Sequence, residues 1–114
     1  MELSKEIQQK IQELQILEQH LQGFLAQKQA FQLELNEATN ALDELKKTKD
    51  EVYKILSGIM LKAMKEDLIK ELEEKKKLLE LRINSIEKQE LLLEKKSNEL
   101  KNEITGEMKV KEKR

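Results

Sequence analysis

The sequence predicts a mainly α fold, in which two long helices form an antiparallel coiled coil joined by a central β-hairpin. Three observations predict it: the composition, a seven-residue apolar repeat in each half, and a block of strand-forming residues at the midpoint. Ala, Glu, Lys, Leu and Arg make up about 59% of the 114 residues, above the roughly one half typical of coiled coils. Leu, Ile, Val and Phe make up about 29%, which exceeds the ~20% below which a highly charged chain is normally disordered.

The composition also excludes several classes of function. With no Cys and one His, a single chain cannot form a Cys- or His-rich zinc site, an iron–sulfur cluster or a disulfide. Apolar runs of at most three residues are too short to cross a bilayer, and the first residues lack the pattern of a signal peptide. The net charge of −1 gives no general attraction to nucleic acid or anionic lipid. We therefore expect a cytoplasmic protein that binds neither nucleic acid nor a membrane.

The chain is expected to form a single domain, 1–114, whose first part is a helical arm over residues 1–49. Alternate steps of four and three residues from Leu3 to Leu45 define 13 seam positions, of which 11 are apolar. This repeat is the signature of a coiled-coil seam, and its period of 3.5 residues predicts a left-handed supercoil. The two exceptions are Lys10 and Lys28, which either set the register or extend their ammonium groups outward.

The second helical arm is expected over residues 65–105, followed by a frayed basic tail over 106–114. The same stepping from Ile69 to Ile104 gives 11 positions, of which eight are apolar. The interruptions are Lys76, Glu90 and Ser97. Gly106 is the expected end of the helix, because glycine readily adopts the conformation that terminates helices.

Residues 50–64 between the arms are expected to form the hairpin, with strands over Val52–Leu56 and Ile59–Met64. Strand-forming residues surround Ser57-Gly58, and glycine accepts the positive φ that tight hairpin turns need. The alternative is one helix running straight through Ser57-Gly58. A reversal at this midpoint would let the two arms run antiparallel.

The hairpin predicts assembly, because two short strands are not stable alone in water and leave open edges. Several copies, or copies plus related chains, would join hairpins edge to edge into a shared sheet or barrel. The candidate oligomerisation residues are Val52, Tyr53, Ile55, Leu56, Gly58, Ile59, Met60 and Leu61. Two sets of side chains compete for the inner face: Val52, Leu56, Ile59 and Leu61 against Tyr53, Ile55, Met60 and Met64.

No catalytic, cofactor-binding or metal-binding residues are predicted. The three glycines are isolated, so there is no glycine-rich phosphate loop, and a coiled coil offers no concave site for catalytic groups. The lysine runs at 46–49 and 75–77 are flanked by acidic residues and are read as solvated helix faces. We expect a protein that is not an enzyme and needs no cofactor.

Several features together resemble a beta-type prefoldin subunit, most closely the archaeal form. They are a glutamine-rich first helix, the segment Glu51-Val52-Tyr53-Lys54, the turn at Gly58, and Lys65–Leu72 opening the second helix. The resemblance implies a hetero-hexamer of two alpha-type and four beta-type subunits, whose hairpins combine into a double β-barrel platform. It further implies that unfolded polypeptides are held near the coiled-coil tips and passed to a group II chaperonin without ATP.

The residues at the predicted tip suit such a role. In the antiparallel pairing, residues 3–11 run opposite about 104–112, and apolar groups at fraying ends can bind varied clients weakly. The candidate client-binding residues are Leu3, Ile7, Ile11, Leu100, Ile104, Met108 and Val110. The alternative is that they only complete the seam.

Other functions stay open on sequence alone. A structural coiled-coil adaptor would bury a stable partner helix and hold no client. A nucleic-acid-binding arm would need a basic stripe, against which the balanced charge speaks. Within the chaperone class, the chain could also form homo-oligomers without alpha-type partners.

Overall fold

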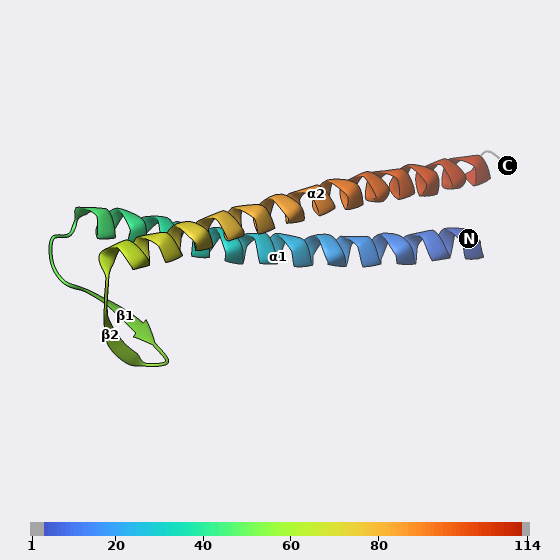
Figure 1. Cartoon of the computed structure of the whole chain (residues 1–114). Helices are drawn as coiled ribbons and strands as arrows, with labels where there is room; N and C mark the ends of the chain where they lie inside the picture. The colour runs from blue at the N-terminus through green and yellow to red at the C-terminus, as the bar shows by residue number, and fades with distance from the viewer. Residues whose placement is uncertain (1–3, 113–114) are drawn as a thin grey trace. The chain divides into compact units, whose positions relative to one another are not determined.

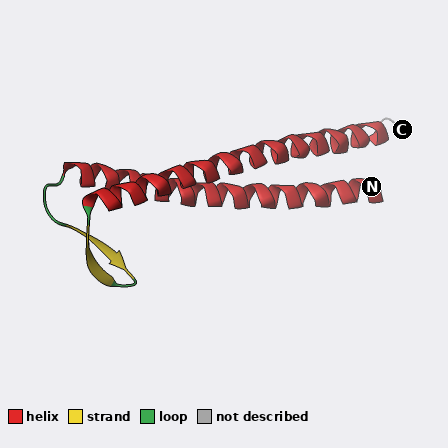
Figure 2. Ribbon diagram, in the orientation of Figure 1, coloured by secondary structure: helices red, strands yellow, loops and turns green. Residues whose placement is uncertain are grey.

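The structure is a computed structural model that describes residues 4–112, and the side chains of residues 4–109. Helix α1 (Lys5–Lys47) leads into strands β1 (Val52–Leu56) and β2 (Ile59–Ala63), and helix α2 (Lys65–Glu112) follows (Figure 1). Figure 2 shows the two helices in red and the two strands, which lie between them in the sequence, in yellow. The predicted fold class is confirmed, and the alternative of one helix through Ser57-Gly58 is wrong.

Helix α1 is fixed at both ends by local interactions. At its start, the hydroxyl of Ser4 accepts a hydrogen bond from the backbone N–H of Ile7 at 3.2 Å, which satisfies one of the unpaired donors of the first turn. At its end, Lys46 and Lys47 lie in the last turn, where positive charge complements the helix dipole. Helix α1 ends at Lys47, shortly before the first strand begins at Val52.

The hairpin is closed by a two-residue turn. Ser57 and Gly58 have φ values of 50° and 79°, and positive φ at both central positions is the pattern of a type I′ turn. Such a turn matches the twist of the flanking strands and sets the register from Leu56↔Ile59 to Val52↔Ala63. The second strand ends at Ala63 rather than Met64, because the Met64 carbonyl already accepts a helical hydrogen bond from Leu68 at 3.1 Å.

Helix α2 does not end at Gly106, and the predicted tail over 106–114 is wrong at its start. The helix continues to Glu112, and Gly106 lacks the positive φ of a helix terminator. A glycine inside a helix costs only about 1 kcal/mol relative to alanine, so one residue does not stop a long helix.

The described residues form two compact units. The terminal unit comprises residues 4–28 and 85–112, and the hairpin unit comprises Gln29–Asn84. In the hairpin unit, the buried side chains are those of Ala38, Leu42, Leu79 and Ile83, and Arg82 stacks over Phe31 with 5.6 Å to the ring centroid. In the terminal unit, the buried side chains are those of Ile7, Ile86, Ser97 and Ile104.

The seam predicted from the seven-residue repeat is the buried stripe in both units. Each seam position from Ile7 to Leu45 and from Ile69 to Ile104 is buried or half-buried, including those occupied by Lys, Glu and Ser. Burying a Leu or Ile side chain fully contributes about 1.5–3 kcal/mol, so this stripe is the main source of stability of each helix pair.

Candidate functional site

The hairpin presents a large apolar surface to solvent. Ile55 is 70% exposed and Met60, its partner across the strands, is 65% exposed. Five other apolar residues of this segment are also exposed: Tyr53, Leu56, Ile59, Leu61 and Met64. Among the described residues the sheet has two strands, so neither outer edge is paired within the chain. An exposed apolar surface beside open edges is typical of a site that binds further strands.

The register sorts the hairpin side chains into two faces. One face carries Val52, Lys54 and Leu56 with Ile59, Leu61 and Ala63, and the other carries Tyr53 and Ile55 with Met60 and Lys62. These are the two sets between which the sequence could not decide, except that Met64 lies outside the strands. Both faces hold exposed apolar groups, so the isolated chain covers neither completely.

The first of these faces is anchored to the helices of the hairpin unit at its open end. Val52 and Lys54 are half-buried and line a hollow of about 550 Å³ together with Leu45, Leu68 and Leu72. The Lys54 ammonium contacts both carboxylate oxygens of Glu71, at 3.0 and 3.1 Å. The part of this face near the turn, with Leu56 and Ile59, stays exposed.

The second face is braced by Glu51. Its carboxylate accepts hydrogen bonds from the Lys62 ammonium at 3.0 Å and from the Tyr53 hydroxyl at 2.9 Å. The hydrogen bond from Lys62, and to a smaller extent that from Tyr53, lowers the pKa of the Glu51 carboxyl. The hairpin is therefore held at its open end by side chains from the same unit, while the turn end is free for contacts with other chains.

The terminal unit brings together most of the predicted client-binding residues, but in a closed arrangement. Ile7 is fully buried, Ile104 is buried, and Ile11 and Leu100 are half-buried. Met108 is 42% exposed. Leu3 lies outside the described residues, and so does the side chain of Val110. The helices run antiparallel here as predicted, because Lys10 of α1 contacts Glu107 of α2 while Lys28, further along α1, contacts the earlier Glu90.

Two interruptions of the predicted seams prove to be partners. The ammonium of Lys28 donates a hydrogen bond to Glu90 at 2.8 Å, with 29% and 13% of the two side chains exposed. In the sequence they are interruptions of two separate seams, but the antiparallel pairing places them opposite each other. This hydrogen bond raises the pKa of the Lys28 ammonium above its ordinary value of 10.5. The pair's contribution to stability is therefore complete at neutral pH and is lost as the pH rises through the raised pKa.

A test of this pair is the replacement Glu90→Gln, which leaves the half-buried Lys28 ammonium without its carboxylate. We expect the melting temperature of the coiled coil to fall by about 2–5 °C, measured by circular dichroism at neutral pH. The double variant Lys28→Leu/Glu90→Leu should melt at or above the wild-type temperature, since apolar residues complete the seam. The control is Glu18→Gln, which removes only an exposed contact of 3.9 Å to Lys101. An equal fall in melting temperature in Glu90→Gln and in Glu18→Gln would contradict a structural role for the pair.

Two adjoining grooves of the terminal unit were missed in the sequence. One, of about 420 Å³, is lined by Ile16, Leu17, His20 and Leu100 together with four charged residues, Glu13, Lys96, Glu99 and Glu103. The other, of about 440 Å³, shares His20 and is lined by Phe24, Leu92 and Leu93. Ile16 and Leu92 lie off the seam and are more than half exposed, so the seven-residue repeat passed over them.

Two kinds of site are not found in the part of the chain that the structure describes. Neither helix contains a segment apolar enough to cross a membrane. No group of three His, Cys, Asp or Glu side chains among residues 4–109 is placed to hold a metal ion.

The fold and the exposed hairpin define a class of protein, a two-helix coiled coil that carries an apolar β-hairpin between its arms. Comparison with known proteins specifies the class further. A family model described as "Prefoldin subunit" matches residues 8–110. The prefoldin subunit beta of Methanospirillum hungatei is 36% identical over 108 residues, covering 93% of this chain and 90% of that one. That of Archaeoglobus fulgidus is 42% identical over 91 residues, 78% of each chain.

A solved structure agrees with the sequence comparisons. The crystal structure of the prefoldin beta subunit from Thermococcus strain KS-1 matches with a TM-score of 0.85 and 36% identity, over 92% of this chain and 94% of that one. The chain belongs to the prefoldin family, as a chaperone subunit of beta type.

Proposed function

We propose that this chain is an ATP-independent holdase subunit that binds unfolded polypeptides at its coiled-coil tip and delivers them to a group II chaperonin. The observation that carries the proposal is that helix ends from both arms lie together in the terminal unit and carry apolar residues. Membership of the prefoldin family supports a chaperone role. No cofactor and no catalytic step are part of the proposal, and the expected compartment is the cytoplasm.

In this proposal the hairpin mediates assembly. Two alpha-type and four beta-type subunits would join hairpins edge to edge into a double β-barrel platform. The contacting residues in this chain are Val52, Tyr53, Ile55, Leu56, Gly58, Ile59, Met60 and Leu61. All of these residues except Val52 are exposed in the single chain, which supports this role, because so much apolar surface beside two open strand edges is stabilised by further strands.

In this proposal clients bind at the tip. The residues concerned are Leu3, Ile7, Ile11, Leu100, Ile104, Met108 and Val110. Each tip would bind an unfolded segment weakly through apolar contacts, and Met108 would adapt to clients of varied shape. Several tips in one assembly would then hold a client by avidity, which requires no strong single site and no ATP.

The proposal is tested by light scattering of a chemically denatured client protein as it aggregates after dilution. The assembled protein, with an alpha-type subunit added, is expected to suppress aggregation in the absence of ATP. A fluorescently labelled client should then pass from the complex to a group II chaperonin. A well-defined assembly that leaves aggregation unchanged would favour the alternative function, a structural coiled-coil adaptor.

A further inference from the structure

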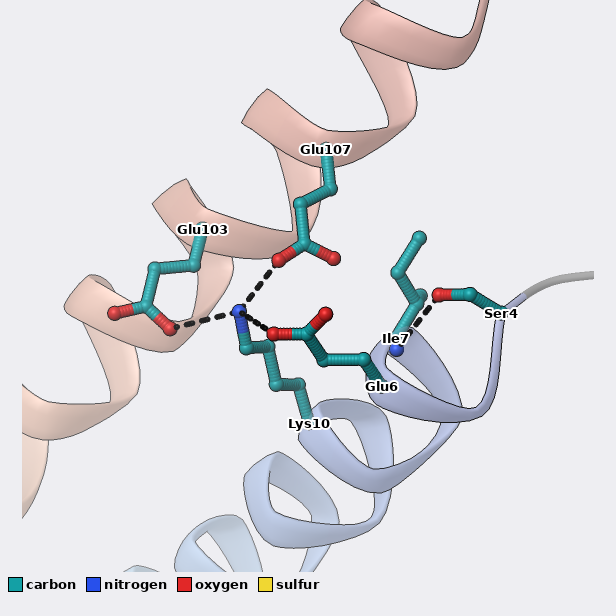
Figure 3. Close-up of polar contacts among 6 residues, drawn as sticks. All are labelled: Ser4, Glu6, Ile7, Lys10, Glu103 and Glu107. Carbon is teal, nitrogen blue, oxygen red and sulfur yellow. Dashed lines mark hydrogen bonds and ion pairs between the residues drawn. The ribbon is translucent and has the colours of Figure 1, made fainter.

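The apolar residues at the tip are covered in the structure, although the proposed function needs them to meet a client. Ile7 is fully buried and Ile104 is 9% exposed. The start of α1 is a regular helical turn here, because Ser4 caps the backbone N–H of Ile7 (Figure 3). A client can therefore reach these two isoleucines only when the ends of the helices separate.

One side chain holds the two helix ends together through charge. Figure 3 shows the Lys10 ammonium of α1 directed at two carboxylates of α2 and one of its own helix. It donates a hydrogen bond to Glu107 at 2.5 Å and forms ion pairs with Glu103 at 3.4 Å and Glu6 at 3.8 Å. Lys10 occupies a seam position, its side chain is 20% exposed, and its ammonium contacts acids of both helices.

The contacts of Lys10 differ from those of an ordinary surface ion pair, because one ammonium lies near three carboxylates. Glu103 and Glu107 are four residues apart on α2, where like charges repel each other. Glu6 of α1 adds a third carboxylate, and among the side chains of residues 4–109 Lys10 is the one cation within 4.0 Å of all three. The hydrogen bond to Glu107 raises the pKa of the Lys10 ammonium, as expected for a charge held by several acids. Without Lys10, three negative charges from two helices would face one another.

We propose that Lys10 is an electrostatic latch, which keeps the tip closed over Ile7 and Ile104 and which must be released before a client is bound. The inference rests on the proposed holdase function and adds a conformational step to it. The apparent affinity for a client is then the affinity of the open tip multiplied by the fraction of time for which the tip is open. The latch keeps the apolar residues of the tip covered when no client is present, and it weakens the binding of clients.

Two substitutions at this position separate the latch from other effects of charge. Lys10→Gln removes the cation and leaves a polar residue on the seam, so the tip should open more often. Lys10→Leu makes the same change of charge but supplies an apolar seam residue that offsets part of the repulsion, so the tip should open less often than in Lys10→Gln. The control is Lys101→Gln, which removes a cation from the same unit, where the contact with Glu18 is exposed and 3.9 Å long.

The experiment uses the full chain in its assembled form and two readouts. Hydrogen exchange of the backbone amides in residues 4–11 and 100–109 reports opening without any client. Fluorescence anisotropy of a labelled, permanently unfolded polypeptide reports the apparent Kd. In Lys10→Gln we expect tip exchange to be faster and the Kd to be tighter, each by about two- to fivefold, the range of a partly exposed ion pair. Both differences should shrink between about 0.05 and 0.5 M NaCl, because salt weakens the latch in the wild type.

The outcomes distinguish the latch from the proposed function. Unchanged exchange in Lys10→Gln, or equal gains in affinity for Lys10→Gln, Lys10→Leu and Lys101→Gln, would overturn the latch. Faster exchange in Lys10→Gln with a weaker Kd would also overturn it, because the tip would then bind clients in its closed form. If no variant and no wild-type assembly binds the polypeptide, the holdase function itself fails, whatever the exchange shows.

Discussion

An aspartate in place of Leu56 or Ile59 is expected to dissolve the assembly while leaving the helix content largely intact. Both side chains lie at the free end of the hairpin and are 55% and 61% exposed in the single chain. A charge there costs the isolated subunit little. Once neighbouring strands cover the position, an unpaired charge costs several kcal/mol, about 3 or more, at each copy of the interface. Sedimentation gives the mass, and circular dichroism gives the helix content.

The matched control for this prediction is Leu33→Asp, which makes the same change at a leucine of α1 that is 60% exposed. It should leave the assembly intact, because Leu33 lies on the helical arm and outside the hairpin. Ile55→Asp tests the opposite face of the hairpin. If the Leu56 and Ile59 variants keep the wild-type mass, the hairpin is not the assembly element. If Ile55→Asp keeps the wild-type mass while the Leu56 and Ile59 variants dissociate, the face that carries Leu56 is the one buried inside the assembly.

Removal of residues 1–8 and 104–114 is expected to abolish the suppression of client aggregation without changing the assembly. The deletion removes Ile7, Ile104 and Met108, and it leaves the hairpin and most of the seam. Because holding by several weak sites depends steeply on each of them, the truncated protein should give no suppression of light scattering even at about tenfold the wild-type concentration.

The control for the deletion is a variant that loses apolar surface elsewhere in the arms. Leu81→Ser and Leu33→Ser remove two exposed leucines of the hairpin unit and should leave suppression unchanged. Full activity of the truncated protein would move the client site away from the tip. The grooves lined by Ile16 and Leu92 would then be the next candidates.

Much of the fold could be predicted because it follows from local patterns. A period of 3.5 residues identified the buried stripe, and burial from Ile7 to Leu45 follows that stripe position by position. The turn was located because Ser57-Gly58 can adopt two successive positive φ values. The helix end at Gly106 was predicted wrongly from the same kind of local signal. A single glycine permits a helix to stop but does not require it, and Lys10 binds Glu103 and Glu107 on both sides of it.

What the sequence did not show depends on contacts between distant segments. Lys28 and Glu90 were seen as two defects in two seams, and only the register of the facing helices makes them a pair. The grooves beside Ile16 and Leu92 were missed for a similar reason, because off-seam residues of two helices form them together. The closed state of the tip depends on the Ser4 cap and the charges around Lys10, which no apolar repeat describes.

The most direct test of the account is to find where a client lies on the assembled protein. A photo-crosslinking amino acid is placed at Met108, in the terminal unit, or at Leu81, in the hairpin unit, and a denatured client is added before illumination. Leu81 is 66% exposed and Met108 is 42% exposed, so exposure alone would favour the crosslink at Leu81. Client binding at the tip predicts that the client is captured predominantly at Met108. Equal or stronger capture at Leu81 would contradict the account.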